Sequence, residues 1–207
     1  MRSDLAALLE SAGEPLSSSA IELLLTHVRL LARWNERFNL TRITSWPGIL
    51  DRHLKESLIP LRWIGQPGRL IDVGSGNGFP GIPILACRNG LEGVLVERSE
   101  KKSLFLEAVI REAGRVNVRV ETRDLQSKSA SEAGSVFDYV ISRATLPPSR
   151  YLELAVSLTA EAGRAFLFAR EEAKSLFKER SGLFEVLSCQ QIPGRADSVL
   201  FVLQRRR

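Results

Sequence analysis

The 207-residue sequence predicts an α/β fold in which a mostly parallel sheet of seven strands ends in an antiparallel strand. From about residue 66 onward, short apolar runs alternate with segments of helical periodicity, which is typical of right-handed crossovers and of a sheet covered on both faces. The last two apolar runs are joined only by Pro193-Gly194-Arg195-Ala196, a connection that suits an antiparallel hairpin at the sheet edge. We therefore predict a helical extension at residues 1–65 and an α/β domain at residues 66–207.

The extension is expected to form helices at about residues 4–12, 17–38 and 47–63. Ser17 to Ser19 offer N-terminal caps for the longest of them. Its apolar residues recur at helical spacing and predict one buried stripe: Ile21, Leu24, Leu25, Val28, Leu31 and Trp34. In the α/β domain, strands are expected at about 69–73, 93–97, 117–121, 137–142, 164–169, 184–190 and 197–204, with helices at about 80–89, 100–113, 149–160 and 171–180.

Composition places the chain among globular proteins, with 44% hydrophobic and 26% charged residues. The net charge of +5 modestly favours acidic partners such as nucleic acid. The two cysteines and two histidines show no metal-ligand spacing, so we expect no metal site and a reducing, cytoplasmic setting. The start of the chain lacks the apolar core of a secretory signal, and no run of eighteen apolar residues occurs. We therefore expect no membrane span.

The most informative segment runs from Asp72 to Ile82, between an apolar run that predicts a strand and another that predicts a helix. Three glycines at alternate positions allow the backbone to turn sharply and to lie close to a ligand, because they have no Cβ. The following helix would direct its free N–H groups and its positive dipole end at that ligand. The segment therefore predicts a cofactor-binding turn, and the alternative is a tight strand-to-helix connection that binds nothing.

The glycine pattern can be read in two registers. A dinucleotide site needs Gly-x-Gly-x-x-Gly directly after the strand, and from Gly74 the third glycine would fall on Phe79. A register that starts two residues later is complete, but it begins too far from the strand and includes Pro80. The other pattern is an acidic residue, any residue, then Gly-x-Gly-x-Gly, formed here by Asp72, Gly74, Gly76 and Gly78. It resembles the first motif of S-adenosylmethionine-dependent methyltransferases, whose cofactor carries cations that suit an acidic side chain.

Three further strand ends carry candidate ligand contacts. Glu97 follows the second strand about twenty residues after the turn, where a carboxylate commonly accepts hydrogen bonds from both ribose hydroxyls of an adenosine. After the third strand, Asp124-Leu125 can contact an adenine ring, or can belong to a solvated loop. Arg143 emerges from the apolar fourth strand and needs an anionic partner, which is a substrate phosphate, a carboxylate or a protein acid.

The chain resembles the family of small-subunit ribosomal RNA guanine-N7 methyltransferases, once called glucose-inhibited division protein B. The resemblance is carried by motifs that follow the family's order and spacing from the first long helix to the fourth strand. These motifs are Trp34-Asn35, Phe38-Asn39-Leu40-Thr41, Arg52-His53-Leu54, Glu56-Ser57-Leu58, Asp72 to Gly76, Gly78 to Pro83, Lys101-Lys102, Phe105-Leu106 and Ile141-Ser142-Arg143-Ala144. The last third of the chain matches only in general pattern.

This resemblance implies a Rossmann-like class I fold, S-adenosyl-L-methionine as cofactor and 16S ribosomal RNA or the small subunit as partner, and we expect a monomer. Cofactor contacts would fall on Gly74, Phe79, Asp124, Leu125 and Arg143, with Glu97 in the ribose position. Asn39, His53 and Arg143 would surround the target base or its phosphates. The chain departs from the family at Asp124-Leu125, where Glu is usual second, at Glu56, where Asp is usual, and at Arg170, where Lys is common.

Guanine N7 has a free lone pair and no proton to lose, so no general base is expected. His53 and Asn39 also have structural interpretations, as a packed helix histidine and as the end of the first long helix. Three functional classes stay open: a ribosomal RNA methyltransferase, a methyltransferase for a small molecule or protein, and a non-catalytic nucleoside-binding module or nicotinamide enzyme. The cationic extension favours the first, although exposed charge alone would give the same pattern.

Overall fold

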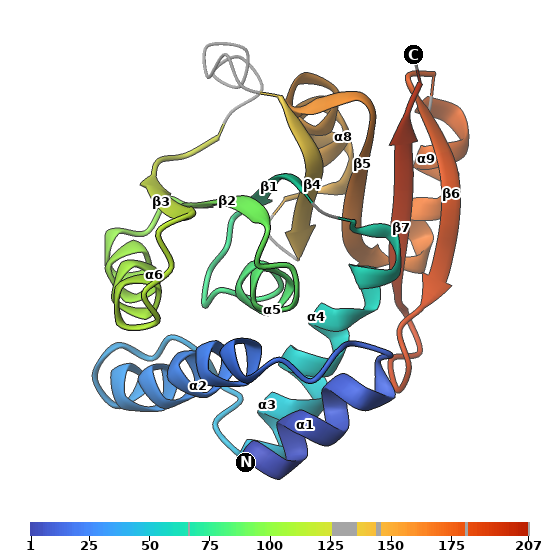
Figure 1. The fold of residues 1–207 in the computed structure, drawn as a ribbon. Coiled ribbons are helices and arrows are strands. Elements are labelled where there is room, and N and C mark those ends of the chain that lie inside the picture. Colours follow the sequence, from blue (N-terminus) through green and yellow to red (C-terminus); the bar gives the residue numbers. More distant parts are fainter. Residues whose placement is uncertain (66, 126–135, 144–145, 181, 207) are drawn as a thin grey trace.

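The computed structural model describes residues 1–65, 67–125, 136–143, 146–180 and 182–206. Within these residues, seven strands form one sheet in the order β3-β2-β1-β4-β5-β7-β6 (Figure 1). The strands are β1 Gly68–Val73, β2 Leu91–Glu97, β3 Val118–Thr122, β4 Phe137–Arg143, β5 Thr159–Arg170, β6 Phe184–Gln191 and β7 Ser198–Arg205. β1 to β5 pair in parallel, whereas β7 is antiparallel to both β5 and β6. The predicted sheet and its antiparallel last strand are confirmed.

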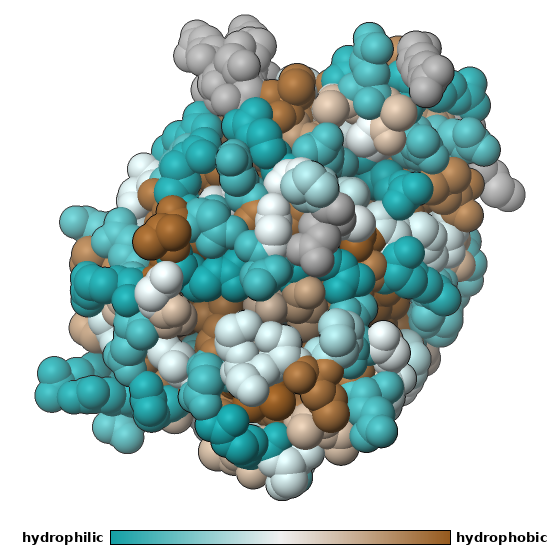
Figure 2. Space-filling model, in the orientation of Figure 1, coloured by the Kyte–Doolittle hydropathy of each residue, from teal (hydrophilic) through white to brown (hydrophobic). Residues whose placement is uncertain are grey.

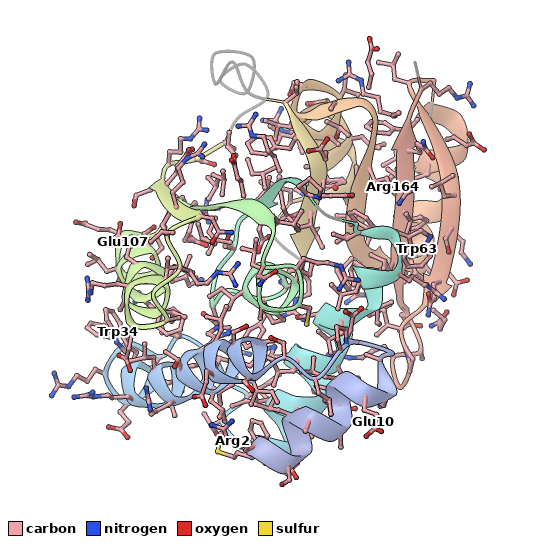
Figure 3. All side chains as sticks on the ribbon, in the orientation of Figure 1. Arg2, Glu10, Trp34, Trp63, Glu107 and Arg164 are labelled. Atoms are coloured by element: carbon pink, nitrogen blue, oxygen red, sulfur yellow. The ribbon has the colours of Figure 1, made fainter. Side chains whose placement is uncertain are left out.

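Two helices of the extension form as the apolar pattern predicts. They are α1 Arg2–Ser11 and α2 Ser18–Phe38. Ser17 caps the start of α2, because its hydroxyl accepts a hydrogen bond from the Ala20 amide, and Asn39, which has a φ of 48°, caps the end. α2 lies along α5 (Gly81–Cys87) and α6 (Glu100–Glu112), as Figure 1 shows. In Figure 3 the labelled Trp34 lies where α2 meets α6, and its ring is 5.8 Å from that of Phe105.

The third helical segment is not the single α-helix that the pattern predicts over 47–63. It consists of α3 Trp46–Ile49, a π-helical turn η1 Leu50–Lys55, α4 Glu56–Leu58 and a 3-10 turn η2 Ile59–Trp63. The apolar spacing did not reveal this change of hydrogen-bonding register, because all four pieces keep one face buried. π turns are rare and frequently lie at functional sites, and this one contains Arg52 and His53.

The two faces of the sheet are buried by different parts of the chain. Side chains alternate along β1, so Leu70 joins the core under α2, α5 and α6, whereas Ile71 joins the core under α8 (Pro148–Leu158) and α9 (Lys174–Arg180). The extension and the sheet therefore share one continuous core on the first face. The division of the chain near residue 65 stays a prediction.

Arg88, at the end of α5, ties the extension to the sheet domain. Its guanidinium forms a two-point ion pair with Glu14, which follows α1, and both side chains are largely buried. It also donates to the carbonyls of Leu61 (3.0 Å) and Ile64 (2.8 Å). A second tie joins Arg164 on β5 to the carbonyl of Trp63, two residues that Figure 3 labels side by side.

β5 begins at Thr159, five residues earlier than expected, because the chain leaves α8 directly into the strand. The segment predicted as a helix over 171–180 starts with a 3-10 turn, η3 Glu171–Ala173, before α9.

In Figure 2, hydrophobic residues on the visible face form separate patches among hydrophilic ones. Within the described residues, no helix has the length and hydropathy of a membrane span.

Candidate cofactor cleft

A cleft of about 1250 Å³ lies at the carboxyl ends of β1, β2, β4 and β5. One wall is the glycine turn after β1, and the opposite wall comes from β5, α9 and the β6–β7 turn, including Phe168, Leu176 and Ile192. The strand order reverses between β1 and β4, and α/β sheets bind ligands at this point. The cleft therefore occupies the position that the fold class predicts for a cofactor site.

The glycine turn is held in place by backbone hydrogen bonds. The amides of Gly74 and Ser75 both donate to the Val96 carbonyl on β2, at 2.8 and 2.9 Å. Gly76 and Gly78 have φ values of 55° and 84°, in the left-handed region that favours glycine. A Cβ on Gly78 would lie 2.4 Å from Cδ1 of Ile82, so the turn packs directly against α5. Gly74, Ser75, Gly76 and Asn77 line the cleft.

Asp72 is fully buried below the turn rather than on the cleft surface. Its Oδ2 accepts a hydrogen bond from the Gly81 amide at 3.0 Å, at the start of α5. Its Oδ1 is buried and has no hydrogen-bond partner among the described residues. Burial raises the pKa of this carboxyl to about 7, against the smaller opposing effect of the Gly81 hydrogen bond. Its predicted role beside the cofactor stays a prediction.

Glu97 lies across the turn, at the end of β2, and lines the cleft. Its Oε2 accepts from the Gly76 amide and its Oε1 from the Ser99 amide, each at 2.9 Å. These two bonds fix the carboxylate, while each oxygen keeps a second lone pair for a further donor. The geometry fits the predicted contact with two ribose hydroxyls.

Phe79 lines the cleft beside the glycine turn and is 5% exposed. Its ring contacts two imidazoles, with centroid distances of 4.4 Å to His27 and 4.6 Å to His53. His27 belongs to α2 and His53 to the π turn η1, so both of these ring contacts come from the extension. His27 was not predicted as a site residue, although a histidine within an apolar helical stripe was a visible signal.

Arg143 at the end of β4 lies within a small polar network. Its Nη2 is 3.2 Å from Nδ1 of His53, and its Nη1 is 3.6 Å from Glu56. Glu56 also pairs with Arg195 on the β6–β7 turn, at 2.6 Å. Glu56 thus connects two guanidiniums from distant parts of the chain, and sequence reasoning did not predict the contribution of Arg195.

The hydrogen bonds of His53 define its protonation. Because a guanidinium can only donate, Nδ1 of His53 accepts, and the proton lies on Nε2, which is 3.3 Å from the Thr41 hydroxyl. Burial, followed by the charge of Arg143, lowers the pKa of His53 to about 4. His53 is therefore neutral at pH 7, and the lone pair on its unprotonated nitrogen, Nδ1, already accepts the hydrogen bond from Arg143.

The other predicted contacts do not line the cleft. Asn39 is exposed and does not line the cleft. It terminates α2, which is the structural role that the sequence offered as the alternative to a contact with the base. Leu125 is packed into the core under α8, and Asp124 beside it is exposed. Ala144 of the family motif lies outside the described residues. Within the described part of the chain, no group of three or more His, Cys, Asp or Glu side chains could hold a metal ion.

A family model described as "GidB: rRNA small subunit methyltransferase G" matches residues 20–193. The chain belongs to this family. The ribosomal RNA small subunit methyltransferase G of Alkalilimnicola ehrlichii is 35% identical over 192 residues, which are 91% of this chain and 84% of the relative. The enzyme named methyltransferase G 1 of Syntrophobacter fumaroxidans is 42% identical over 106 residues, and the match spans about half of each protein, 51% of this chain and 48% of the relative.

Among solved structures, a predicted O-methyltransferase of Agrobacterium tumefaciens aligns with a TM-score of 0.59 at 23% identity, covering 75% of this chain and 80% of that one. This likeness concerns the fold alone. Together with the strand order, it confirms the Rossmann-like class I methyltransferase fold that the sequence predicts for this GidB-family chain.

Proposed function

We propose that this GidB-family chain transfers a methyl group from S-adenosyl-L-methionine to N7 of a guanine in 16S ribosomal RNA of the small subunit. The observation that carries the proposal is the pairing of the glycine turn with Glu97 at the switch point of a class I methyltransferase sheet. Membership of a family described as rRNA small subunit methyltransferase G supports the substrate. We further propose that the chain acts as a monomer in the cytoplasm.

The residues of the cleft fit the cofactor. The turn at Gly74 and Gly76 presents backbone without side chains, and Glu97 keeps lone pairs for ribose hydroxyls. Asp72 lies beneath with an unpartnered buried oxygen, which suits a nearby cationic group. We assign cofactor contacts to Gly74, Gly76, Phe79, Glu97 and Arg143, which line the cleft, and a supporting role beneath the turn to Asp72 and Gly78. The contacts with Asp124 and Leu125 rest on the family resemblance alone. When bound, S-adenosylmethionine supplies a methyl group on a positively charged sulfur.

This chain has to position a base rather than deprotonate it. His53 cannot serve as a general base in this geometry, since its Nδ1 lone pair accepts from Arg143 and its Nε2 carries the proton. Guanine N7 needs no base, because its lone pair is already free. Orientation of two reactants can supply roughly 7–11 kcal/mol of a barrier. We assign that orienting role to Arg143 and His53, with Asn39 as an outer contact.

The charge of the cleft suits a polyanion. Among the described residues, six cationic side chains line it against three carboxylates, and two of those carboxylates are already engaged: Glu56 by two arginines and Glu97 by backbone amides. Four of these cations lie on η1, between β2 and α6, on α6 and at the end of β5, in that order: Arg52, Arg98, Lys102 and Arg170. Contacts between such cations and phosphates make binding strongly dependent on salt.

Transfer of labelled methyl groups to small ribosomal subunits from a strain that lacks this chain tests the proposal. Mapping of N7-methylguanine should place the label at one guanine of the 16S RNA. Gly74→Val should abolish transfer by filling the turn, while Gly182→Val, at a glycine with nothing within 4 Å of an added Cβ, should leave it. Arg143→Ala should lower transfer to RNA.

Label in a small molecule or protein, with none in RNA and little effect of salt, would support the second functional class instead. Binding of the cofactor without transfer to any substrate would support the nucleoside-binding module.

A further inference from the structure

His27 is a buried histidine to which the proposed function assigns no contact with cofactor or substrate. It lies on α2, in the middle of the extension, and is 0% exposed. Its Nε2 is 2.6 Å from the main-chain carbonyl oxygen of Asn77, inside the glycine turn. Because a carbonyl can only accept, Nε2 carries the proton and Nδ1 holds a lone pair. Nδ1 is buried without a hydrogen-bond partner among the described residues.

An orphaned buried nitrogen has a cost, because it loses its hydrogen bond to water without replacement. If α2 only needed to fill the space beside Phe79, an apolar side chain would avoid that cost. The polar group that His27 adds is one N–H, directed at one carbonyl of the turn. Burial lowers the pKa of His27 to about 4, so this N–H belongs to a neutral ring at pH 7.

The carbonyl that His27 binds belongs to the peptide between Asn77 and Gly78. Gly78 has a φ of 84°, and glycine on one side of a peptide lets that peptide rotate more easily. The N–H of the same peptide donates to the Ser75 carbonyl at 2.8 Å, and the bond from His27 holds its other end, the carbonyl oxygen. His27 also packs against the ring of Phe79, with 4.4 Å between ring centroids and 33° between the ring planes. One side chain of α2 therefore restrains both a peptide and an aromatic ring of the cleft wall.

We propose that His27 is a positioning residue for the cofactor, which it serves by fixing the Asn77 peptide and the Phe79 ring from behind the cleft. It touches neither cofactor nor substrate. The inference rests on the proposed assignment of the cleft to S-adenosylmethionine, and it makes the extension a part of the cofactor site. The first helices of the chain then contribute to binding independently of any contact with RNA.

Two substitutions separate the donor from the ring. His27→Gln keeps an N–H near the position of Nε2 but removes the aromatic ring, whereas His27→Phe keeps a ring against Phe79 and leaves the Asn77 carbonyl unpaired. Leu24→Ala is the matched control, because Leu24 is buried in the same helix and packs in the core without any hydrogen bond to the turn. Binding of S-adenosylhomocysteine is measured by calorimetry, at a temperature where every variant is fully folded.

We expect His27→Phe to raise the dissociation constant about tenfold, the size expected from the loss of one buried hydrogen bond. His27→Gln should remain within about threefold of wild type, and Leu24→Ala should lower the unfolding temperature without changing the dissociation constant. Equal affinity of wild type and His27→Phe would overturn the proposal, as would equal losses in the Gln and Phe variants. Failure of the wild type itself to bind would overturn the assignment of the cleft as well.

Discussion

Asp72 gives the sharpest link between the geometry of the turn and a measurable property. In the folded protein its carboxyl is fully buried, and burial raises its pKa to about 7 from an ordinary value of 3.8. In the unfolded chain the same carboxyl is solvated and loses its proton near its ordinary value. Between about pH 4 and pH 7, the folded state therefore binds a proton that the unfolded state does not bind.

The sign and size of the effect follow from this difference. Because the folded state binds more protons in that range, the free energy of unfolding falls as pH rises. A difference of about three between the two pKa values corresponds to about 4 kcal/mol, lost between pH 4 and 7. Below pH 4 both states are protonated and the effect vanishes. Asp72→Asn cannot titrate, so its stability should lack this slope.

Urea denaturation from pH 4.5 to 8, followed by circular dichroism, measures the difference between wild type and Asp72→Asn. Over this range, which omits the part of the effect below pH 4.5, the difference in free energy of unfolding should shift by about 3 kcal/mol in favour of the variant as pH rises. The slope is the readout, because the buried amide of Asn can lower stability equally at every pH. Asp51→Asn, at an exposed carboxylate on η1, should follow the wild type. If the difference in free energy of unfolding between wild type and Asp72→Asn stays constant with pH, the reasoning is refuted.

Three other changes have defined outcomes. Gly78→Ala should lower stability by about 3 kcal/mol in thermal unfolding and abolish cofactor binding, since its Cβ would strike Ile82 at 2.4 Å, whereas Gly114→Ala should cost only about 1 kcal/mol. Glu56→Gln should lower the free energy of unfolding by about 3 kcal/mol in urea titrations, because two guanidiniums lose their shared carboxylate; an unchanged midpoint would contradict this. Arg170→Ala should weaken binding to the ribosomal RNA and reduce the salt slope by about one, with cofactor affinity unchanged.

Much of the fold could be predicted because the spacing of apolar residues along the sequence follows which faces of the helices and strands are buried. The seven strands lie close to their expected positions, since each carries a short apolar run that one or both faces of the sheet bury. The interrupted helix over 46–63 could not be predicted, because a π turn changes hydrogen-bond partners while it preserves the buried face. The early start of β5 was missed since Ala162 and Gly163 are typical of a loop, yet they lie within the strand.

The cofactor side of the site could be predicted from local motifs, whereas its support could not. Gly74 and Glu97 follow directly from a strand end and a fixed spacing, and both line the cleft. His27 and Arg195 reach the site from fifty or more residues away along the chain, and such contacts leave no local pattern. Glu56 was visible only as a departure from the family, with no indication that it bridges two arginines.

The central pairing of the sheet has a consequence for how the protein folds. β1 and β4 are neighbours, with Leu70 opposite Tyr139 and Asp72 opposite Ile141, although about seventy residues separate them. Contacts of such sequence separation form slowly, since closing the long intervening loop loses entropy before any packing is gained. The glycine turn and Arg143 lie at the ends of these two strands. We therefore expect ligand recognition to require the pairing of β1 with β4 and to be absent while only the local β1–β2 and β2–β3 pairs have formed.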